Sequence, residues 1–386
     1  MTISQRRLRC AAVLLSLGFG LVACAPGAST LESASPAPSA TPTPTPTPTP
    51  KTEIQLAAER VAEMPLREQA ALVTMGYADG TDPSALAAYV AGGPRGLILM
   101  GNNIPASPEQ LRSLTDAVHA ASPDALIATD EEGGDVARLP WDDLPSARTL
   151  KDEDAVAAQA AFSARGQLLD QGGIDINFGV VADVPRSDGS FIFRRSYGTD
   201  PRAVAERVAA VVTGEKGLVA TTLKHFPGHG AAEGDSHHAI PTTGLSLDEW
   251  RAVDALPFQA GIDAGAELVM MGHLRFTSVS DRPATLSPEW YGILRDELGF
   301  TGVAVTDDLG MLLSSGDPAY ADPVTNAVMA VDAGADMVLT IAGSSPDTAT
   351  RIIDALAARS ASDPAFATRL AEAATRVAAL SASRTP

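Results

Sequence analysis

The chain has 386 residues, with 47 Asp or Glu against 28 Lys or Arg, so its formal net charge is −19 at neutral pH. A chain this acidic repels the phosphate backbone, which argues against nucleic acid as a partner. Hydrophobic residues make up 45% of the chain and only two cysteines occur, Cys10 and Cys24, so the fold must be stabilised by its core rather than by disulfides.

The first predicted element is a signal peptide over residues 1–23. Three arginines precede an apolar run, residues 11–23, which is too short to span a bilayer. The run ends in Leu-Val-Ala-Cys, which resembles the bacterial lipobox, and this resemblance implies that Cys24 receives lipid. We therefore expect an exported protein that is anchored to the cell membrane through Cys24 and faces the cell wall. The alternative is an ordinary cleaved signal followed by a chance cysteine.

A linker and one folded domain are predicted after the signal. Residues 24–50 are rich in Ser, Ala, Thr and Pro and end in a Thr-Pro repeat, a composition that favours extended conformations and buries no apolar surface. Residues 51–386 have the length of a single large α/β barrel. We expect one catalytic domain there, working as a monomer.

Seven apolar runs in this domain predict strands, and each is followed by a polar or Gly-rich loop and an Ala-rich helical stretch. The runs are nearly continuous rather than alternating, which is typical of parallel strands covered on both faces by helices. A final helical stretch is expected from about residue 346 to 380. The predicted strands are residues 96–100, 125–129, 174–181, 219–223, 267–271, 303–306 and 337–340.

Polar residues follow several of these strands directly. Asp130, Lys224 with His225, His273 and Asp307 each lie at the carboxyl end of a run. The pattern of strands fits either an open sheet or a closed barrel, but in a barrel those ends converge on one face and form a site. We therefore predict a (β/α)8 barrel of the α/β class.

The strongest local pattern surrounds Asp307. Residues 293–311 read as a helix, a turn, a buried strand and then the pair Asp307-Asp308, which presents a carboxylate at the mouth of a strand. This segment resembles the active-site signature of glycoside hydrolase family 3, and the resemblance implies that Asp307 is the nucleophile. A helix N-cap is the competing interpretation of the pair, and it suits Asp308.

A second pattern follows the strand at 219–223. Residues 224–230 read Lys-His-Phe-Pro-Gly-His-Gly and residues 235–237 read Asp-Ser-His. Both resemble the β-N-acetylglucosaminidase branch of family 3, which implies that His237 is the general acid/base and that Asp235 orients it. Histidine titrates in the range that this role requires, and a carboxylate partner selects its tautomer.

A competing interpretation of the same region is a metal site, because His and Asp are good ligands. The adjacent lysine would place a positive charge beside the metal, and the spacing matches no common structural zinc pattern. We therefore expect neither a metal nor an organic cofactor. The ligands under that interpretation would be His225, His229, Asp235, His237 and His238.

Three further segments resemble family 3 and imply sugar-binding roles. Residues 129–139 resemble an Asp-Gln-Glu-Gly-Gly-x-Val-x-Arg-Leu pattern, which implies that Asp130 accepts hydrogen bonds from sugar hydroxyls and that Arg138 supports Asp130 in the substrate site. Residues 191–201 match an Ile-Gly-acid-Arg-Ser segment whose arginine corresponds to Arg195, although Phe and Arg stand here in place of the Gly and the acid. Lys224 and His225 complete the expected binding set. We interpret the third segment, residues 173–184, as mainly architectural.

These resemblances together imply a retaining β-N-acetylhexosaminidase that removes terminal N-acetylglucosamine. Peptidoglycan fragments are the substrate expected for a wall-facing enzyme. Three alternatives remain open: a phosphorylase of the same family, in which phosphate replaces water, a β-glucosidase or xylosidase of the same family, and a sugar-binding lipoprotein without activity.

Overall fold

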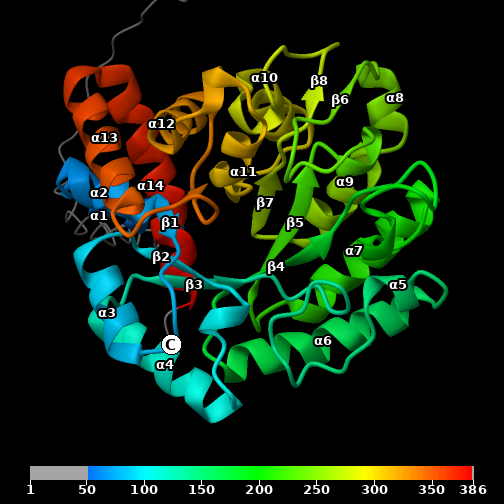
Figure 1. Cartoon of the computed structure of the whole chain (residues 1–386), viewed down its shortest axis with the longest axis horizontal. Coiled ribbons are helices and arrows are strands. Elements are labelled where there is room, and N and C mark those ends of the chain that lie inside the picture. Colours follow the sequence, from blue (N-terminus) through cyan, green and yellow to red (C-terminus); the bar gives the residue numbers. More distant parts are fainter. Residues whose placement is uncertain (1–50, 385–386) are drawn as a thin grey trace, which may run out of the picture. The chain divides into compact units, whose positions relative to one another are not determined.

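A computed structural model of the chain describes residues 51–384 (Figure 1). The predicted signal peptide, the predicted lipidation site Cys24 and the predicted linker 24–50 lie outside the described residues. Within the described part, no helix is both long and apolar enough to cross a membrane.

Eight parallel strands form the centre of the domain. They are hydrogen-bonded in the order β10-β1-β2-β3-β4-β5-β7-β9. The two ends of this order meet where Val305 of β9 bridges Met337, next to β10, and the Thr306 N–H donates to the Met337 carbonyl at 3.0 Å. This closes the sheet and confirms the predicted (β/α)8 barrel. The strands are β1 (Thr74–Gly76), β2 (Gly96–Leu99), β3 (Leu126–Thr129), β4 (Ile176–Val181), β5 (Ala220–Phe226), β7 (Leu268–Met271), β9 (Val303–Thr306) and β10 (Val338–Leu339).

All seven predicted strands are present, with ends shifted by at most three residues. The prediction missed β1, which has only three residues and directly follows an Ala-containing helix. A run this short carries too few apolar residues to be distinguished from the end of the helix. The prediction also missed a small two-stranded ribbon of β6 (Thr242–Thr243) and β8 (Arg275–Phe276).

Helices surround the barrel and cover its outer face (Figure 1). Several begin with an Asp-Pro pair, in which the Asp side chain accepts a backbone N–H of the first turn and proline occupies a position that needs no N–H donor. The helices are α1 (Glu53–Ala62), α2 (Leu66–Leu72), α3 (Pro83–Gly92), α4 (Pro108–Ala121), α5 (Ala147–Leu150), α6 (Ala155–Gln171), α7 (Pro201–Glu215), α8 (Leu247–Ala252), α9 (Ala255–Ala264), α10 (Pro288–Gly292), α11 (Leu309–Ser314), α12 (Pro323–Ala333), α13 (Thr348–Ser362) and α14 (Pro364–Arg384).

The predicted final helical stretch is two helices, α13 and α14. They are separated at Asp363, whose backbone is extended with φ −139° and ψ 105°. Pro364 follows, and a residue before proline is disfavoured in the helical conformation. The proline therefore ends one helix and begins the next, so residues 348–384 form two helices and not one continuous helix.

The barrel core is packed with apolar side chains, and every residue of β2, β3, β4, β5, β7 and β9 is buried. Phe226 at the end of β5 packs edge-on against Trp250, Phe258 and Trp290, with ring centroids 5.2–5.9 Å apart. This aromatic cluster supports the loop that leaves β5, which carries much of the site described next.

Candidate active site

A cavity of about 290 Å³ lies at the carboxyl end of the barrel. Asp130 follows β3, Lys224 and His225 lie in the last three residues of β5, and Asp307 follows β9. The fold thereby brings together residues that are far apart in sequence. Seven of the eight residues predicted for catalysis and sugar binding line the cavity: Asp130, Arg138, Arg195, Lys224, His225, His237 and Asp307. The eighth, Asp235, contacts His237.

Lys224 lies between two carboxylates in the cavity wall. Its Nζ is 2.8 Å from Asp130 Oδ1 and 2.6 Å from Glu132 Oε1. Arg195 donates to both carboxylate oxygens of Glu132, at 2.7 and 2.9 Å, and Arg138 donates to Asp130 at 3.3 Å. Positive and negative groups therefore alternate along the wall. This alternation fixes five side chains, which come from the loop after β3, the loop after β4 and strand β5.

The same alternation sets the protonation of these groups. Burial alone would raise the pKa of Asp130, but Lys224 and Arg138 outweigh burial and lower this pKa to about 2. Burial likewise acts to raise the pKa of Glu132, and Lys224 and Arg195 bring it below its ordinary value. Asp130 is therefore an ionised acceptor at neutral pH, which suits binding of sugar hydroxyls by charge-assisted hydrogen bonds.

His225 is held in one orientation by Asp183. The Asp183 carboxylate lies 2.8 Å from His225 Nδ1 and accepts the backbone N–H groups of His225 and His229 at 3.2 and 2.5 Å. This network assigns the ring proton to Nδ1, so Nε2 carries a lone pair, 3.4 Å from Arg195. Burial, followed by the charge of Arg195, lowers the pKa of His225 well below its ordinary value. His225 is therefore a neutral side chain with an acceptor nitrogen.

Asp307 lies at the base of the site and is fixed through its backbone. Its N–H donates to the Met271 carbonyl at the end of β7 at 2.9 Å, and its Oδ1 accepts the N–H of Asp308 at 2.8 Å. Burial acts to raise the pKa of Asp307, but His225, His273 and the Asp308 N–H bring it below its ordinary value. An ionised, partly exposed carboxylate that lines the cavity is a competent nucleophile.

Asp308 has a different role from its neighbour. Its carboxylate accepts the N–H of Gly310 at the start of α11 and those of Ile341 and Ala342 in the loop after β10, at 2.8–2.9 Å. Burial raises its pKa to about 6. The N-cap interpretation is therefore correct for Asp308, which anchors the peptide that presents Asp307.

His237 and Asp235 form a pair on the rim of the cavity. Asp235 Oδ1 is 2.6 Å from His237 Nδ1 and accepts the His237 backbone N–H at 2.9 Å. The His237 side chain is 54% exposed and lines the cavity. With the Nδ1 proton directed to Asp235, Nε2 is the nitrogen left to exchange a proton. The pair thus has the arrangement that an acid/base group requires.

Two successive arginines clamp the loop that follows β3. Arg195 pairs with Glu132. Arg194 instead donates from Nε and Nη2 to the two carboxylate oxygens of Asp135, at 2.6 and 2.9 Å. The Phe193 ring lies under the ammonium of Lys151, 4.5 Å from it. The unusual Phe-Arg pair thus lies outside the cavity wall and leaves Arg195 pointing into it.

Sequence reasoning missed two members of the site. Glu132 lies in the segment 129–139 but was given no role from the sequence, yet it bridges Lys224 and Arg195. The segment containing Asp183 was interpreted as mainly architectural, and this was incomplete because Asp183 orients His225. A carboxylate two residues beyond a buried strand was the available signal for Asp183. For Glu132, the available signal was its position two residues after Asp130.

The residues of the metal-site interpretation do not share one partner, although His237 and His238 both contact Asp235. His225 contacts Asp183, His229 Nε2 is 3.0 Å from Ser236 Oγ, and His237 contacts Asp235. Across residues 51–384, no group of three or more His, Cys, Asp or Glu side chains is arranged to hold a metal ion. The geometry therefore favours the acid/base interpretation of His237.

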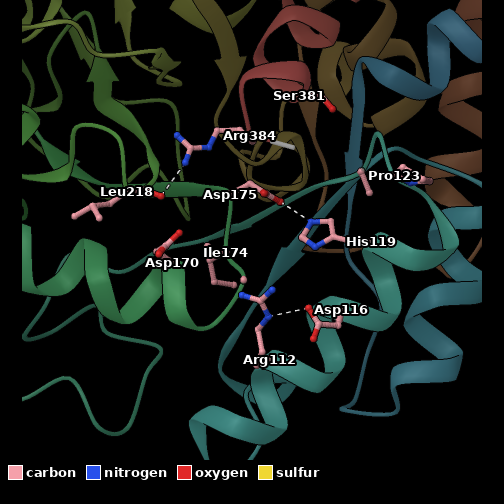
Figure 2. A pocket seen from close by; sticks show the side chains of 12 residues that line it. Arg112, Asp116, His119, Pro123, Asp170, Ile174, Asp175, Leu218, Ser381 and Arg384 are labelled. Carbon is pink, nitrogen blue, oxygen red and sulfur yellow. Dashed lines mark hydrogen bonds and ion pairs between the residues drawn. The ribbon is translucent and has the colours of Figure 1, made fainter. Parts of the chain in front are cut away.

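A second cavity, of about 300 Å³, lies at the opposite end of the barrel (Figure 2). Its lining includes residues that precede β3, β4 and β5, namely Ala125, Asp175 and Leu218. His119 Nε2 is 2.9 Å from Asp175 Oδ2, and the same oxygen accepts the Ile127 N–H at 2.7 Å. No predicted site residue lines this cavity.

The chain is similar to known glycoside hydrolases in sequence. The model of the glycosyl hydrolase family 3 N-terminal domain matches residues 71–380. A beta-hexosaminidase of Stenotrophomonas maltophilia is 40% identical over 257 residues, which cover 63% of this chain and 75% of that protein.

Solved structures agree with the sequence comparison. A glycoside hydrolase family 3 beta-N-acetylglucosaminidase from a Paenibacillus species superposes with a TM-score of 0.76 at 31% identity. The match covers 83% of this chain and 63% of that longer one, so this chain spans less than two thirds of it. A beta-N-acetylhexosaminidase from Beutenbergia cavernae superposes with a TM-score of 0.75 at 29% identity, over 83% of this chain and 99% of that one.

Proposed function

Since the chain belongs to glycosyl hydrolase family 3, we propose that it is a retaining β-N-acetylhexosaminidase that removes terminal, non-reducing N-acetylglucosamine from β-glycosides. The observation that carries this proposal is the placement of Asp307 in a cavity whose rim bears the His237–Asp235 pair. A nucleophilic carboxylate and a separate proton donor are the two groups that retaining hydrolysis of a glycoside needs.

Recognition of the terminal sugar is assigned to the charged wall. Asp130 accepts hydrogen bonds from hydroxyl groups, and the neutral Nε2 of His225 accepts another. Lys224 and Arg195 donate to the sugar and keep Asp130 and Glu132 ionised. The cavity volume lies at the lower end of the range of about 300–1,000 Å³ for small-molecule sites, which favours one terminal sugar over several.

The reaction proceeds in two displacements. Asp307 attacks the anomeric carbon, the bond from that carbon to the leaving oxygen breaks, and protonated His237 gives its Nε2 proton to that oxygen. Neutral His237 then takes a proton from water, the water oxygen attacks the anomeric carbon, and the bond to Asp307 breaks. Two inversions restore the β configuration. Asp235 stabilises the imidazolium that is present before the first displacement and after the second.

The cellular setting belongs to the proposal as well. Residues 1–23 read as a signal peptide, Cys24 as a lipid attachment site and residues 24–50 as a linker, which together would hold a monomeric domain, residues 51–386, on the outer side of the cell membrane. An enzyme in that position encounters peptidoglycan fragments in which N-acetylglucosamine is linked to N-acetylmuramic acid. We propose such fragments as the natural substrate.

The test is hydrolysis of 4-nitrophenyl N-acetyl-β-D-glucosaminide, measured with and without inorganic phosphate, for the wild type and for Asp307→Asn. Turnover that needs Asp307 and is unchanged by phosphate supports the hydrolase. Release of a sugar 1-phosphate only when phosphate is present would replace the proposal with a phosphorylase. Sugar binding without any turnover would identify a binding protein instead.

A further inference from the structure

Phe191 presents an aromatic ring at the rim of the active-site cavity. It is 39% exposed and lines that cavity, whereas the next residue, Ile192, is fully buried and anchors the segment. Few large hydrophobic side chains are exposed in residues 51–384: besides Phe191, only Ile54, Leu56 and Val156, none of which lines this cavity. A partly exposed Phe ring forgoes part of the stabilisation that full burial would give, so its exposure at a binding site points to a ligand that covers it.

The ring of Phe191 lies beside the proton donor. Its centroid is 6.0 Å from the His237 ring, which it meets edge-on, and 5.4 Å from the ring of the buried His229. His229 is fixed by its backbone bond to Asp183 and by Ser236. The position of Phe191 is therefore defined relative to the group that protonates the leaving oxygen.

We propose that Phe191 is a specificity-determining residue that forms the apolar wall for the leaving group and packs against the C–H face of a second pyranose. This inference rests on the proposed function, because it takes His237 as the donor to the glycosidic oxygen. His237 must contact the glycosidic oxygen in order to protonate it. The leaving group is bonded to that oxygen, so it lies next to the side chains that surround His237 on the rim. Phe191 is the aromatic side chain there.

The chemistry of the two parts of the cavity differs in the way this assignment requires. The deep part carries Asp130, Glu132, Arg195 and Lys224, whose paired charges suit directed hydrogen bonds to one sugar under the proposed function. The rim offers a flat apolar ring, which contacts the C–H face of a pyranose without fixing its hydroxyl groups. Such a wall favours a sugar as leaving group and tolerates variation in its substituents.

The test compares kcat/KM for two substrates that share the terminal sugar and differ in the leaving group: N,N′-diacetylchitobiose, which leaves a pyranose, and methyl N-acetyl-β-D-glucosaminide, which leaves methanol. With the full chain, we expect Phe191→Ala to lower kcat/KM for the disaccharide by about threefold to tenfold. We expect the value for the methyl glycoside to change by less than about twofold, because methanol offers no face to the ring.

Two further variants make the comparison specific. Phe191→Tyr keeps the ring, and we expect it to retain the wild-type preference for the disaccharide. Val156→Ala removes an exposed apolar side chain, 70% exposed, from helix α6 outside the cavity, and it should change neither substrate.

Equal losses on both substrates would overturn the proposal, because they would mean that Phe191 acts through His237 and not on the leaving group. Unchanged activity of Phe191→Ala on the disaccharide would overturn it as well. Failure of the proposed function is distinguishable from either result, since the wild type would then release no N-acetylglucosamine from either substrate.

Discussion

The two ends of the barrel are built from similar parts and differ in how those parts are used. Each end has a cavity of about 300 Å³ and a His–Asp pair within 3 Å, His237–Asp235 at the carboxyl end and His119–Asp175 at the amino end. At the amino end Asp175 contacts His119 of helix α4 (Figure 2). The same carboxylate oxygen accepts the Ile127 N–H, so Asp175 joins helix α4 to β3. A cavity and a His–Asp pair are therefore not sufficient to indicate a catalytic site.

Carboxylates at the two ends of the barrel also differ in what they contact. At the amino end, the buried Asp336 accepts hydrogen bonds from Arg295, Arg369 and Arg376, and Arg295 and Arg369 also donate to backbone carbonyls. At the carboxyl end, Asp130 faces the cavity although it is paired with Lys224. Asp336 with its arginines therefore stabilises the chain, whereas Asp130 remains accessible to a ligand.

The largest expected effect is at Asp307, the proposed nucleophile. We expect Asp307→Asn to lower kcat by on the order of 10⁴-fold or more, because the amide cannot attack the anomeric carbon. The thermal midpoint should stay close to wild type, since Asp307 contacts Asp308 only through the backbone N–H of Asp308. Asp170→Asn, at an exposed aspartate that lines the other cavity, is the matched control and should leave kcat unchanged.

The next effect separates the two His–Asp pairs. We expect His237→Ala to lower kcat/KM for a disaccharide by about 10²- to 10⁴-fold, and less for a nitrophenyl glycoside whose leaving group needs no proton. We expect His119→Ala to leave both values unchanged and to lower the free energy of unfolding by about 1 kcal/mol. Comparable loss of activity in the two variants would refute the division between the ends.

A third prediction concerns the charged wall. Lys224→Met leaves Asp130 and Glu132 without their shared partner, and we expect a loss of about 3–5 kcal/mol in the free energy of unfolding together with a raised KM. Denaturant unfolding and steady-state kinetics measure the two effects. Lys216→Met, at an exposed lysine that follows helix α7, should change stability by less than about 0.5 kcal/mol. A stable Lys224→Met variant with wild-type KM would contradict the role of the wall.

The smallest effect is a pH dependence at the amino half of the barrel. Burial raises the pKa of Glu215 to about 7, although Asn177 and Thr221 hydrogen-bond to it. A raised pKa means that its contribution to stability is complete below the unfolded-state value and is lost as pH rises to about 7. We expect Glu215→Gln to remove this loss. Between pH 5 and pH 8 its unfolding free energy should fall less than that of wild type, by on the order of 1–2 kcal/mol, with kcat unchanged.

The sequence predicts the strands of this barrel well and its contacts less completely. The strands are near-continuous apolar runs, and Asp130, Lys224 and Asp307 directly follow or end them, so the fold and the site arise from the same signal. β1 was missed because three residues carry no periodicity. The role of Glu132 depends on Lys224, 92 positions away, and that of Asp183 on His225, 42 positions away. Only the folded structure brings these partners together.

The most direct test of the account is to locate the covalent intermediate. In His237→Ala, 4-nitrophenyl N-acetyl-β-D-glucosaminide can still glycosylate the enzyme, because nitrophenolate leaves without a proton, whereas hydrolysis of the intermediate lacks its base. Rapid quenching, proteolysis and mass spectrometry should then find one N-acetylhexosamine unit on Asp307. An adduct on another residue, or steady turnover of this variant with no adduct at all, would contradict the assignment of Asp307 as the nucleophile.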